Sequence, residues 1–120
     1  MANRPQYLDF LVEQFGTMGE ITARAMFGGH VLYCDAIPFA LVADNAVYLK
    51  ADDQNRPSFL DGGFRPFQPF PDKPGVMQYY ETPPEVFEDP AAMKRWAGGA
   101  IAAGRRAHAG KSPRTSKRRS

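Results

Sequence analysis

The sequence predicts a two-layer α+β domain, in which an antiparallel sheet of about five strands packs with an N-terminal helix and a long C-terminal helix. Two observations of pattern lead to this fold class. Apolar residues recur at helical spacing near both ends of the chain, and strand-like segments separated by two-residue turns occupy its middle. The 120 residues, 43 % hydrophobic and 12 % aromatic, suffice for one core and exclude wholesale disorder.

Composition also excludes several kinds of protein. The longest unbroken apolar stretch, residues 37–43, is far shorter than the roughly 20 residues of a membrane-spanning helix. The N-terminus carries no apolar signal segment, and Cys34 is the single cysteine, so no internal disulfide can form. We therefore expect a cytoplasmic protein.

The first predicted element is a helix over residues 4–15. Asn3 is placed to cap this helix, Pro5 to occupy its first turn and Gln6 to complete a capping box. Gly16 is expected to end it. The apolar stripe that should face the core consists of Tyr7, Leu8, Leu11, Val12 and Phe15.

The next four elements are strands of an antiparallel meander. They cover residues 20–27, 30–34, 37–43 and 46–51. Asp35-Ala36 and Asp44-Asn45 suit the two-residue turns of β-hairpins. Such turns fix the register, which pairs Tyr33 with Pro38, Leu32 with Phe39, Val31 with Ala40, and Val42 with Val47.

In this register both faces of the meander are substantially apolar. One face carries Val31, Tyr33, Ala40, Val42, Val47 and Leu49. The other face carries His30, Leu32, Cys34, Phe39, Leu41, Tyr48 and Lys50. Either helices cover both faces, or the proline-rich loop covers one, or one face contacts a second molecule. The last alternative favours a homodimer.

The second half of the chain begins with a short helix near residues 54–60, which Asp52 and Asp53 can cap. Residues 64–75 contain several prolines and predict an extended loop rather than a helix. Residues 76–81 alternate in polarity and predict the fifth strand.

Two successive helix starts complete the fold. Thr82 and Asp89 are each followed by proline, so both residues are expected to act as caps. The second helix is long, and its apolar stripe around Trp96 should be buried against the sheet. Its glycines weaken it by about 1 kcal/mol each relative to alanine, so packing must hold it.

Charge divides the chain unevenly. Residues 1–104 hold 8 Lys and Arg against 13 Asp and Glu, whereas residues 105–120 hold 7 cations and no acid. We assign residues 1–107 to the domain and residues 108–120 to a disordered basic tail. The tail either contacts nucleic acid phosphates or only confers solubility. Its candidate phosphate contacts are Arg105, Arg106, Lys111, Arg114, Lys117, Arg118 and Arg119.

No arrangement of residues predicts catalysis or a metal site. His30 and Cys34 lie four residues apart in one strand, which separates a nucleophile from its base by about 13 Å. Asp52-Asp53 and Glu88-Asp89 precede helices, where acidic residues act as caps. Gly28-Gly29 leads into a strand and favours a tight turn over a phosphate loop. We therefore expect a non-enzymatic protein with neither cofactor nor metal.

Aromatic residues of the proline-rich loop fit either of two roles. They anchor the loop over the core, or they contact a partner. Arg65 and Lys73 are the only cations among them, which gives base stacking little support. With two strand residues they form a candidate interaction surface of Phe64, Phe67, Phe70, Phe39 and Tyr48.

A set of short segments carries a family resemblance. They are Arg24-Ala-Met-Phe-Gly-Gly29, Val31-Leu-Tyr33, Phe39-Ala-Leu-Val42, Val47-Tyr-Leu-Lys50, Met77-Gln-Tyr-Tyr80 and Pro83-Pro-Glu-Val86. In this order they resemble the TfoX/Sxy N-terminal domain family over residues 4–107. The resemblance implies an α+β fold and a link to competence regulation. Full-length members act as transcriptional coactivators alongside a cyclic-AMP receptor protein, and they carry a second, helical domain where this sequence has its basic tail.

We interpret the chain as a regulatory interaction domain that acts through protein contacts in transcription regulation, with a transcription factor as the expected kind of partner. Two alternatives remain open. One is a nucleic-acid-associated protein that uses the basic tail. The other is a small-molecule binder with a pocket near Tyr33, Tyr79, Tyr80 and His30.

Overall fold

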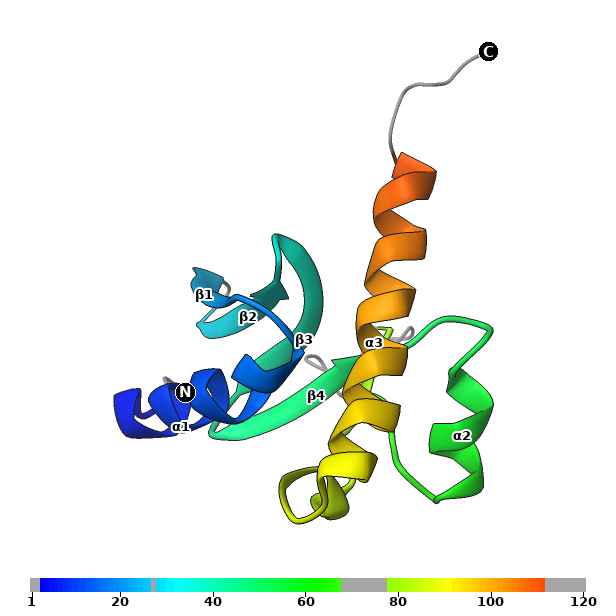
Figure 1. Ribbon diagram of the computed structural model, residues 1–120, viewed down its shortest axis with the longest axis horizontal. Helices are drawn as coiled ribbons and strands as arrows, with labels where there is room; N and C mark the ends of the chain where they lie inside the picture. Colours follow the sequence, from blue (N-terminus) through cyan, green and yellow to red (C-terminus); the bar gives the residue numbers. More distant parts are fainter. Residues whose placement is uncertain (1–2, 27, 68–77, 112–120) are drawn as a thin grey trace.

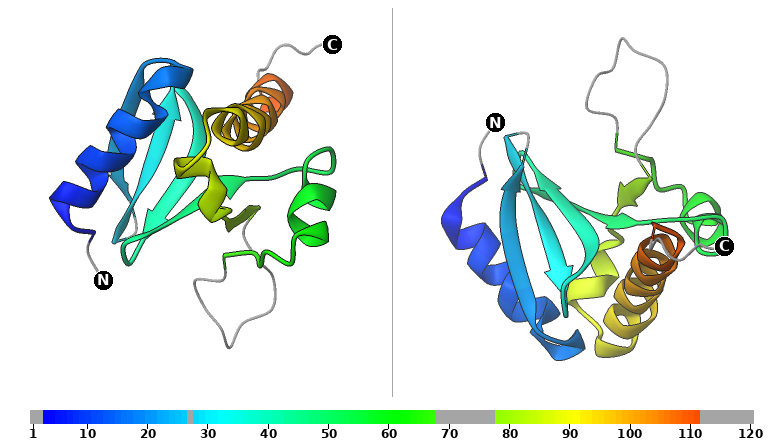
Figure 2. Two further views of the ribbon diagram at one scale, coloured as in Figure 1. Left: turned by 60° about the horizontal axis from the view of Figure 1, so that its bottom comes forward. Right: turned by 90° about the horizontal axis from the view of Figure 1, so that it is seen from above.

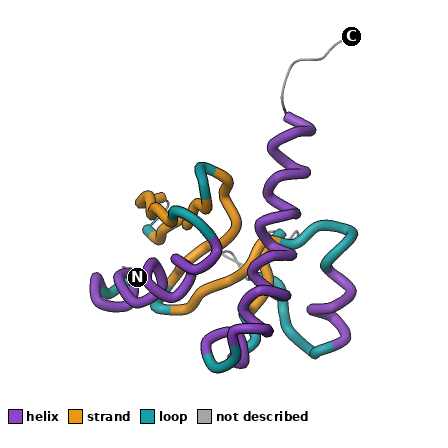
Figure 3. The backbone as a smooth tube through the Cα atoms, in the orientation of Figure 1, coloured by secondary structure: helices purple, strands orange, loops and turns teal. Residues whose placement is uncertain are grey.

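The elements follow the expected order along the chain. A computed structural model describes residues 3–26, 28–67 and 78–111 (Figure 1). Within these ranges the elements are α1 (Pro5–Phe15), the 3₁₀ turn η1 (Gly16–Met18), β1 (Ile21–Met26), β2 (Gly29–Cys34), β3 (Ile37–Ala43), β4 (Ala46–Lys50), α2 (Arg56–Asp61), β5 (Tyr79–Glu81), the 3₁₀ turn η2 (Pro84–Phe87) and α3 (Pro90–Lys111). Figure 3 shows how α1 and α3 flank the strands.

The strands form a single antiparallel sheet in the order β1-β2-β3-β4-β5. Helices α1 and α3 pack on the same face of this sheet (Figure 2), where their apolar side chains join one core. The predicted fold class is therefore confirmed. No helix in the described ranges combines the length and apolar character that crossing a membrane requires.

Two-residue turns connect β2 to β3 and β3 to β4, as predicted. Asp35 and Ala36 have φ of 50° and 71°, and Asp44 and Asn45 have φ of 52° and 60°. Two successive positive φ angles define the type I′ turn, whose twist matches that of the flanking strands. Asn and Asp tolerate this conformation, whereas Ala36 occupies it at a steric cost.

A β-bulge makes part of the predicted register wrong. Tyr33 pairs with Pro38 as expected, but Leu32 then pairs with Ala40 rather than with Phe39. Phe39 is the extra residue on β3, so two residues of that strand oppose one residue of β2. Pro38 has no backbone N–H, but Tyr33 directs its own backbone groups toward β1, so the β2–β3 ladder loses no donor at this pair.

The bulge redistributes the residues between the two faces. Leu32, Ala40, Val42, Val47 and Leu49 now share the face covered by the helices. Val31 and Leu41, a cross-strand pair, are buried on the opposite face, where their neighbour Tyr48 on the next strand is half-buried. The helix-covered face is therefore the more apolar of the two, whereas the predicted register made both faces substantially apolar.

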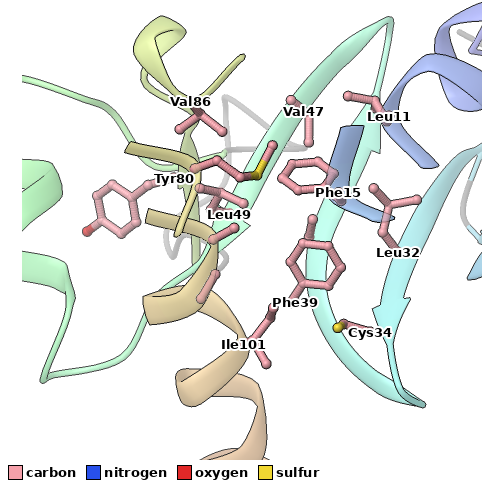
Figure 4. Packing of buried hydrophobic residues seen from close by; sticks show 14 of the residues in the cluster. Leu11, Phe15, Leu32, Cys34, Phe39, Val47, Leu49, Tyr80, Val86 and Ile101 are labelled. Carbon is pink, nitrogen blue, oxygen red and sulfur yellow. The ribbon is translucent and has the colours of Figure 1, made fainter. Parts of the chain in front are cut away.

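The core lies between the helices and the sheet. Phe15 of α1 meets Phe39 edge to face, with 5.2 Å between ring centroids (Figure 4). Phe59 of α2 stacks on Tyr80 of β5 at 5.3 Å. The other large buried members include Leu11, Leu32, Leu49, Val86, Met93 and Ile101.

Asn3 does not cap α1, contrary to the prediction. The N-cap residue is Arg4, without a side-chain capping bond. Asn3 is instead buried, and its amide nitrogen lies 2.9 Å from the His30 ring nitrogen and donates to the Val42 carbonyl. Its side-chain oxygen accepts from the Asn45 N–H at 2.8 Å. These bonds fasten the start of α1 to β2 and to the β3–β4 turn.

Of the two helix caps predicted later in the chain, at Thr82 and Asp89, one is wrong and one is confirmed. Thr82 does not cap η2, because its hydroxyl donates to the Val47 carbonyl at 2.8 Å. Asp89 does cap α3, since its carboxylate accepts from the Ala91 N–H at 3.1 Å. Helix α3 runs to Lys111 and so crosses the domain boundary expected after residue 107.

The apolar stripe of α3 is buried as expected at Met93, Ala97, Ala100 and Ile101, but Trp96 itself is only partly buried at the margin of the core, so its expected deep burial is wrong. Its ring lies 5.0 Å from that of Phe59 and 6.0 Å from that of Phe64. The indole N–H donates to Glu85 at 2.7 Å. Trp96 therefore joins α3 to α2 and η2. The helix expected at 54–60 begins at Arg56, and residues 76 and 77 of the expected fifth strand lie outside the described ranges.

Candidate functional site

A groove of about 460 Å³ opens where α1, the β3–β4 hairpin, the end of β5 and η2 meet. We call it the aromatic groove, because four aromatic side chains from separate segments line it. Its principal lining residues are Tyr7, Val47, Tyr48, Phe64, Glu81 and Phe87. A surface of this composition, hollow and mostly apolar, is typical of a binding site for another molecule.

The apolar surface continues from the groove onto α1. Phe10 lies 6.4 Å from Tyr7 and 5.6 Å from Phe87, measured between ring centroids. Phe10 is nevertheless 42 % exposed, which is unusual for so large an apolar side chain. Phe87 also contacts the core residue Phe15 at 5.6 Å. The groove therefore rests on rigid core packing and presents an open aromatic rim.

The ionisable groups that line the groove are a pair of tyrosines and a carboxylate. Burial raises the pKa of Tyr7 and of Tyr48, and the negative charge of Glu81 raises that of Tyr48 further. Both hydroxyls therefore stay protonated at neutral pH and can donate hydrogen bonds. Glu81 accepts from the Arg65 backbone N–H at 2.9 Å, and Asp44 adds a second negative charge near Tyr48.

The candidate interaction surface is brought together only in part. Phe64 and Tyr48 line the groove, and Phe67 lies 4.8 Å from Tyr48 between ring centroids. Phe70 lies outside the described residues. Phe39 is 0 % exposed and belongs to the core, so its assignment to a surface is wrong.

Sequence reasoning missed Tyr7 and Phe87 as groove residues, and Phe10 as part of the aromatic rim beside the groove. The helical spacing of α1 assigned Tyr7 to the core stripe, and it left Phe10 on the opposite, solvent-facing side. Phe87 comes from η2, which follows Tyr7 by most of the length of the chain. An aromatic residue on the polar side of α1 was the one local signal that could have identified this site.

The basic residues before the tail do not form one surface. Arg105 is exposed, whereas Arg106 is bound to Asp52 through Nε and Nη2 at 2.5 and 2.8 Å. This contact lowers the pKa of Asp52 to about 2, with backbone hydrogen bonds from Gln54 and Asn55 adding to the effect. Arg106 thus fixes α3 to the β4–α2 loop. The remaining tail cations, Arg114, Lys117, Arg118 and Arg119, lie outside the described residues, and Lys111 ends α3.

A second hollow of about 350 Å³ lies between α3 and the β4–α2 loop. Arg56 at its margin bonds to Asp53 at 2.6 Å and also to the Gln78 side chain. With Arg106 bound to Asp52, these charges are matched within the fold. Within the described ranges, no group of three His, Cys, Asp or Glu side chains is arranged to hold a metal ion.

His30 and Cys34 lie at opposite ends of β2, and each of them contacts a residue on another segment. Cys34 is buried, its thiol contacts the Met18 carbonyl at 3.5 Å, and burial raises its pKa. His30 is bonded to Asn3. Of the four residues expected near a ligand pocket, Tyr33 and Tyr79 share a face and lie close enough to interact electrostatically. Tyr80 packs in the core, and His30 lies on the helix-covered face, so the full set is not brought together.

The structure is thus a small α+β domain with an aromatic groove on its surface. The sequence profile of the TfoX N-terminal domain matches residues 13–104. The chain therefore belongs to the TfoX N-terminal domain family, whose role in competence is regulatory. A search of curated proteins found no match to the chain.

Proposed function

We propose that this chain is a non-enzymatic interaction domain that regulates transcription through a protein partner, such as a transcription factor, and that the aromatic groove receives a segment of that partner. The groove is the observation that carries the proposal. Its lining comes from segments that are spread between residues 7 and 87, so it exists only in the folded domain. Family membership supports a regulatory role.

The chemistry of the groove indicates which kind of segment fits. Tyr7, Phe64 and Phe87 offer aromatic surface, which contributes strongly to protein interfaces and suits apolar anchors. Glu81 and Asp44 place two negative charges near Tyr48 at one side, and Arg65, which pairs with Glu81 at 3.4 Å, offsets one of them. The partner segment therefore carries apolar side chains next to Lys or Arg, and the negative charge of residues 1–104 assists its approach.

Site-specific photocrosslinking tests the groove directly. A benzoylphenylalanine replaces Tyr48 in the groove, and in the control it replaces Leu60, which is 56 % exposed on α2. We expect a protein adduct from position 48 in nuclease-treated extract, and its crosslinked peptide should carry apolar residues beside Lys or Arg. Equal adducts from both positions, or no adduct from position 48, contradict the proposal.

The same partner, once purified, allows a quantitative test. Tyr7→Ala and Glu81→Gln should each weaken binding by about tenfold, which corresponds to about 1.4 kcal/mol, whereas Leu60→Ala should leave it unchanged. The melting temperature of each variant checks that the fold is intact. Binding that survives both groove substitutions would place the partner elsewhere.

One observation supports nucleic-acid contact as a second candidate function. The last turns of α3 project beyond the sheet (Figure 1) and carry exposed Arg105 toward a segment rich in cations and free of acids. DNA binding should then weaken steeply with salt. The slope of the logarithm of the binding constant against the logarithm of the salt concentration should fall in magnitude by roughly 0.9 for each phosphate contact removed. Removal of residues 112–120 tests this, and an unchanged salt slope speaks against it.

A further inference from the structure

The two edges of the sheet differ in how they are protected. At the β5 edge, residues 65–67 run alongside the strand, with Phe67 N–H donating to the Tyr79 carbonyl at 2.7 Å and Glu81 N–H to the Arg65 carbonyl at 2.9 Å. At the other edge lies β1, whose residues 22–26 are all exposed. Within the described ranges, no segment pairs with the outer side of β1.

The backbone groups that β1 directs outward can be identified from its pairing with β2. The Asp35 N–H donates to the Glu20 carbonyl at 2.9 Å, so residue 20 directs its backbone groups inward. In an antiparallel ladder this direction alternates from residue to residue. Thr22 and Arg24 therefore bond inward to β2, whereas Ile21, Ala23 and Ala25 direct their N–H and C=O groups away from the sheet.

The side chains of β1 leave this edge open to another strand. β1 has neither proline nor lysine, and its only charged residue is Arg24. Natural sheets commonly block an exposed edge with such residues, with a bulge or with a covering segment. Ala23 and Ala25 are small and exposed on the face where the helices lie, so they allow a second strand to approach.

We propose that β1 pairs in antiparallel fashion with β1 of a second copy of this chain, which joins the two sheets across a two-fold axis. The charges of the strand favour this occupant. With the axis at Thr22, Glu20 of each copy faces Arg24 of the other, and the edge is complementary to itself. An axis at Arg24 would instead oppose two arginines.

This register also satisfies the outward backbone groups. Ile21 of one copy and Ala23 of the other form hydrogen-bonded pairs on both sides of the axis, with about four bonds in all. Thr22 faces Thr22 of the second copy in a non-hydrogen-bonded pair, where the Cα atoms lie about 4.5 Å apart. The groove residues lie on other elements, so this dimer is independent of the proposed function.

Sedimentation equilibrium between about 1 and 100 µM tests the assembly, because ordinary specific interfaces dissociate within or below this range. We expect the 13.3 kDa chain to form a dimer. Ala23→Pro removes an outward donor without touching the bonds to β2, so it should give a folded monomer. A wild-type chain that remains monomeric at 100 µM overturns the proposal.

Charge exchange and disulfide trapping test the register without disturbing the fold. Glu20→Arg and Arg24→Glu should each weaken the dimer at least tenfold, and the two together should restore it. Oxidised Thr22→Cys should form a linked dimer, because this Cα separation suits a disulfide. Ala25→Cys is the matched control and should stay unlinked. Failure of the double exchange to restore dimerisation, or equal linking of both cysteine variants, overturns the proposed pairing.

Discussion

Gly104→Ala should destabilise the domain, although the same substitution elsewhere in α3 should stabilise it. Gly104 is buried where α3 lies against β3. A Cβ atom at this position would overlap the Pro38 carbonyl oxygen and would approach the Ile37 Cγ2 atom to 2.8 Å. Real Cβ atoms do not make such contacts, so the helix and the strand would have to separate.

Two opposing free energies decide the magnitude. Alanine favours the helix over glycine by about 1 kcal/mol. Overpacking a close contact costs typically 1–3 kcal/mol, and the obstacle here is largely backbone of a central strand, which cannot rotate away as a side chain could. We therefore expect Gly104→Ala to lower the free energy of unfolding by up to about 2 kcal/mol net.

Gly98→Ala is the matched control on the same helix. Its Cβ atom would lie 3.7 Å from the Met18 Cε atom, an ordinary van der Waals contact. This variant should therefore gain about 0.5–1 kcal/mol from helix propensity.

Urea and thermal denaturation followed by circular dichroism measure both variants. A difference of 1 kcal/mol shifts the melting temperature of such a domain by about 4 °C or more. If Gly104→Ala is as stable as Gly98→Ala, the close approach of α3 to β3 does not determine which residue is tolerated at position 104, and the reasoning is refuted.

Three further predictions concern stability. Ala36→Asn should raise the unfolding free energy by about 0.5–1 kcal/mol in thermal denaturation, because asparagine tolerates the φ of 71° better than alanine does. Asp52→Asn should cost about 1 kcal/mol at pH 7, a value reduced because both partners in the contact with Arg106 are about one-third exposed. Since Asp52 has a folded pKa of about 2 against 3.8 ordinarily, this contribution is complete above pH 4 and is lost as the pH falls toward 2, where urea titrations of variant and parent should converge. Trp96→Ala should cost about 3 kcal/mol in the same assay, through its contacts with Phe59 and Glu85, and an unchanged midpoint would show that these contacts are dispensable.

The parts of the fold that the sequence predicted well depend on local chemistry. Asp44-Asn45 and Asp35-Ala36 are two-residue connections between strand-like segments. Connections of this length are typical of β-hairpins, so both turns could be predicted. Asp89 followed by proline correctly placed the start of α3. Each of these features is determined within a few residues, so a single sequence suffices to predict it.

The wrong predictions involve residues whose partners are distant in the sequence. Asn3 has the chemistry of a cap, but partners on three other segments, including His30 and Asn45, bind its side chain more completely. Trp96 lies on an apolar stripe, but Glu85 offers an acceptor for its N–H away from the sheet. Local periodicity does not indicate which partners such a side chain adopts, because the free energies of the alternative contacts depend on tertiary packing.

The bulge at Phe39 links the fold to the candidate site. A regular ladder would have put Phe39 on the same face of the sheet as Tyr48, and the predicted interaction surface depends on that placement. The extra residue turns Phe39 into the core, where it packs on Phe15, while Tyr48 stays beside Phe67 and the groove. One irregular residue thus separates the aromatic side chains that hold the domain together from those that remain available to a partner. Recognition and stability can therefore vary independently at these two positions, so substitutions at Tyr48 are expected to alter binding before they alter the fold.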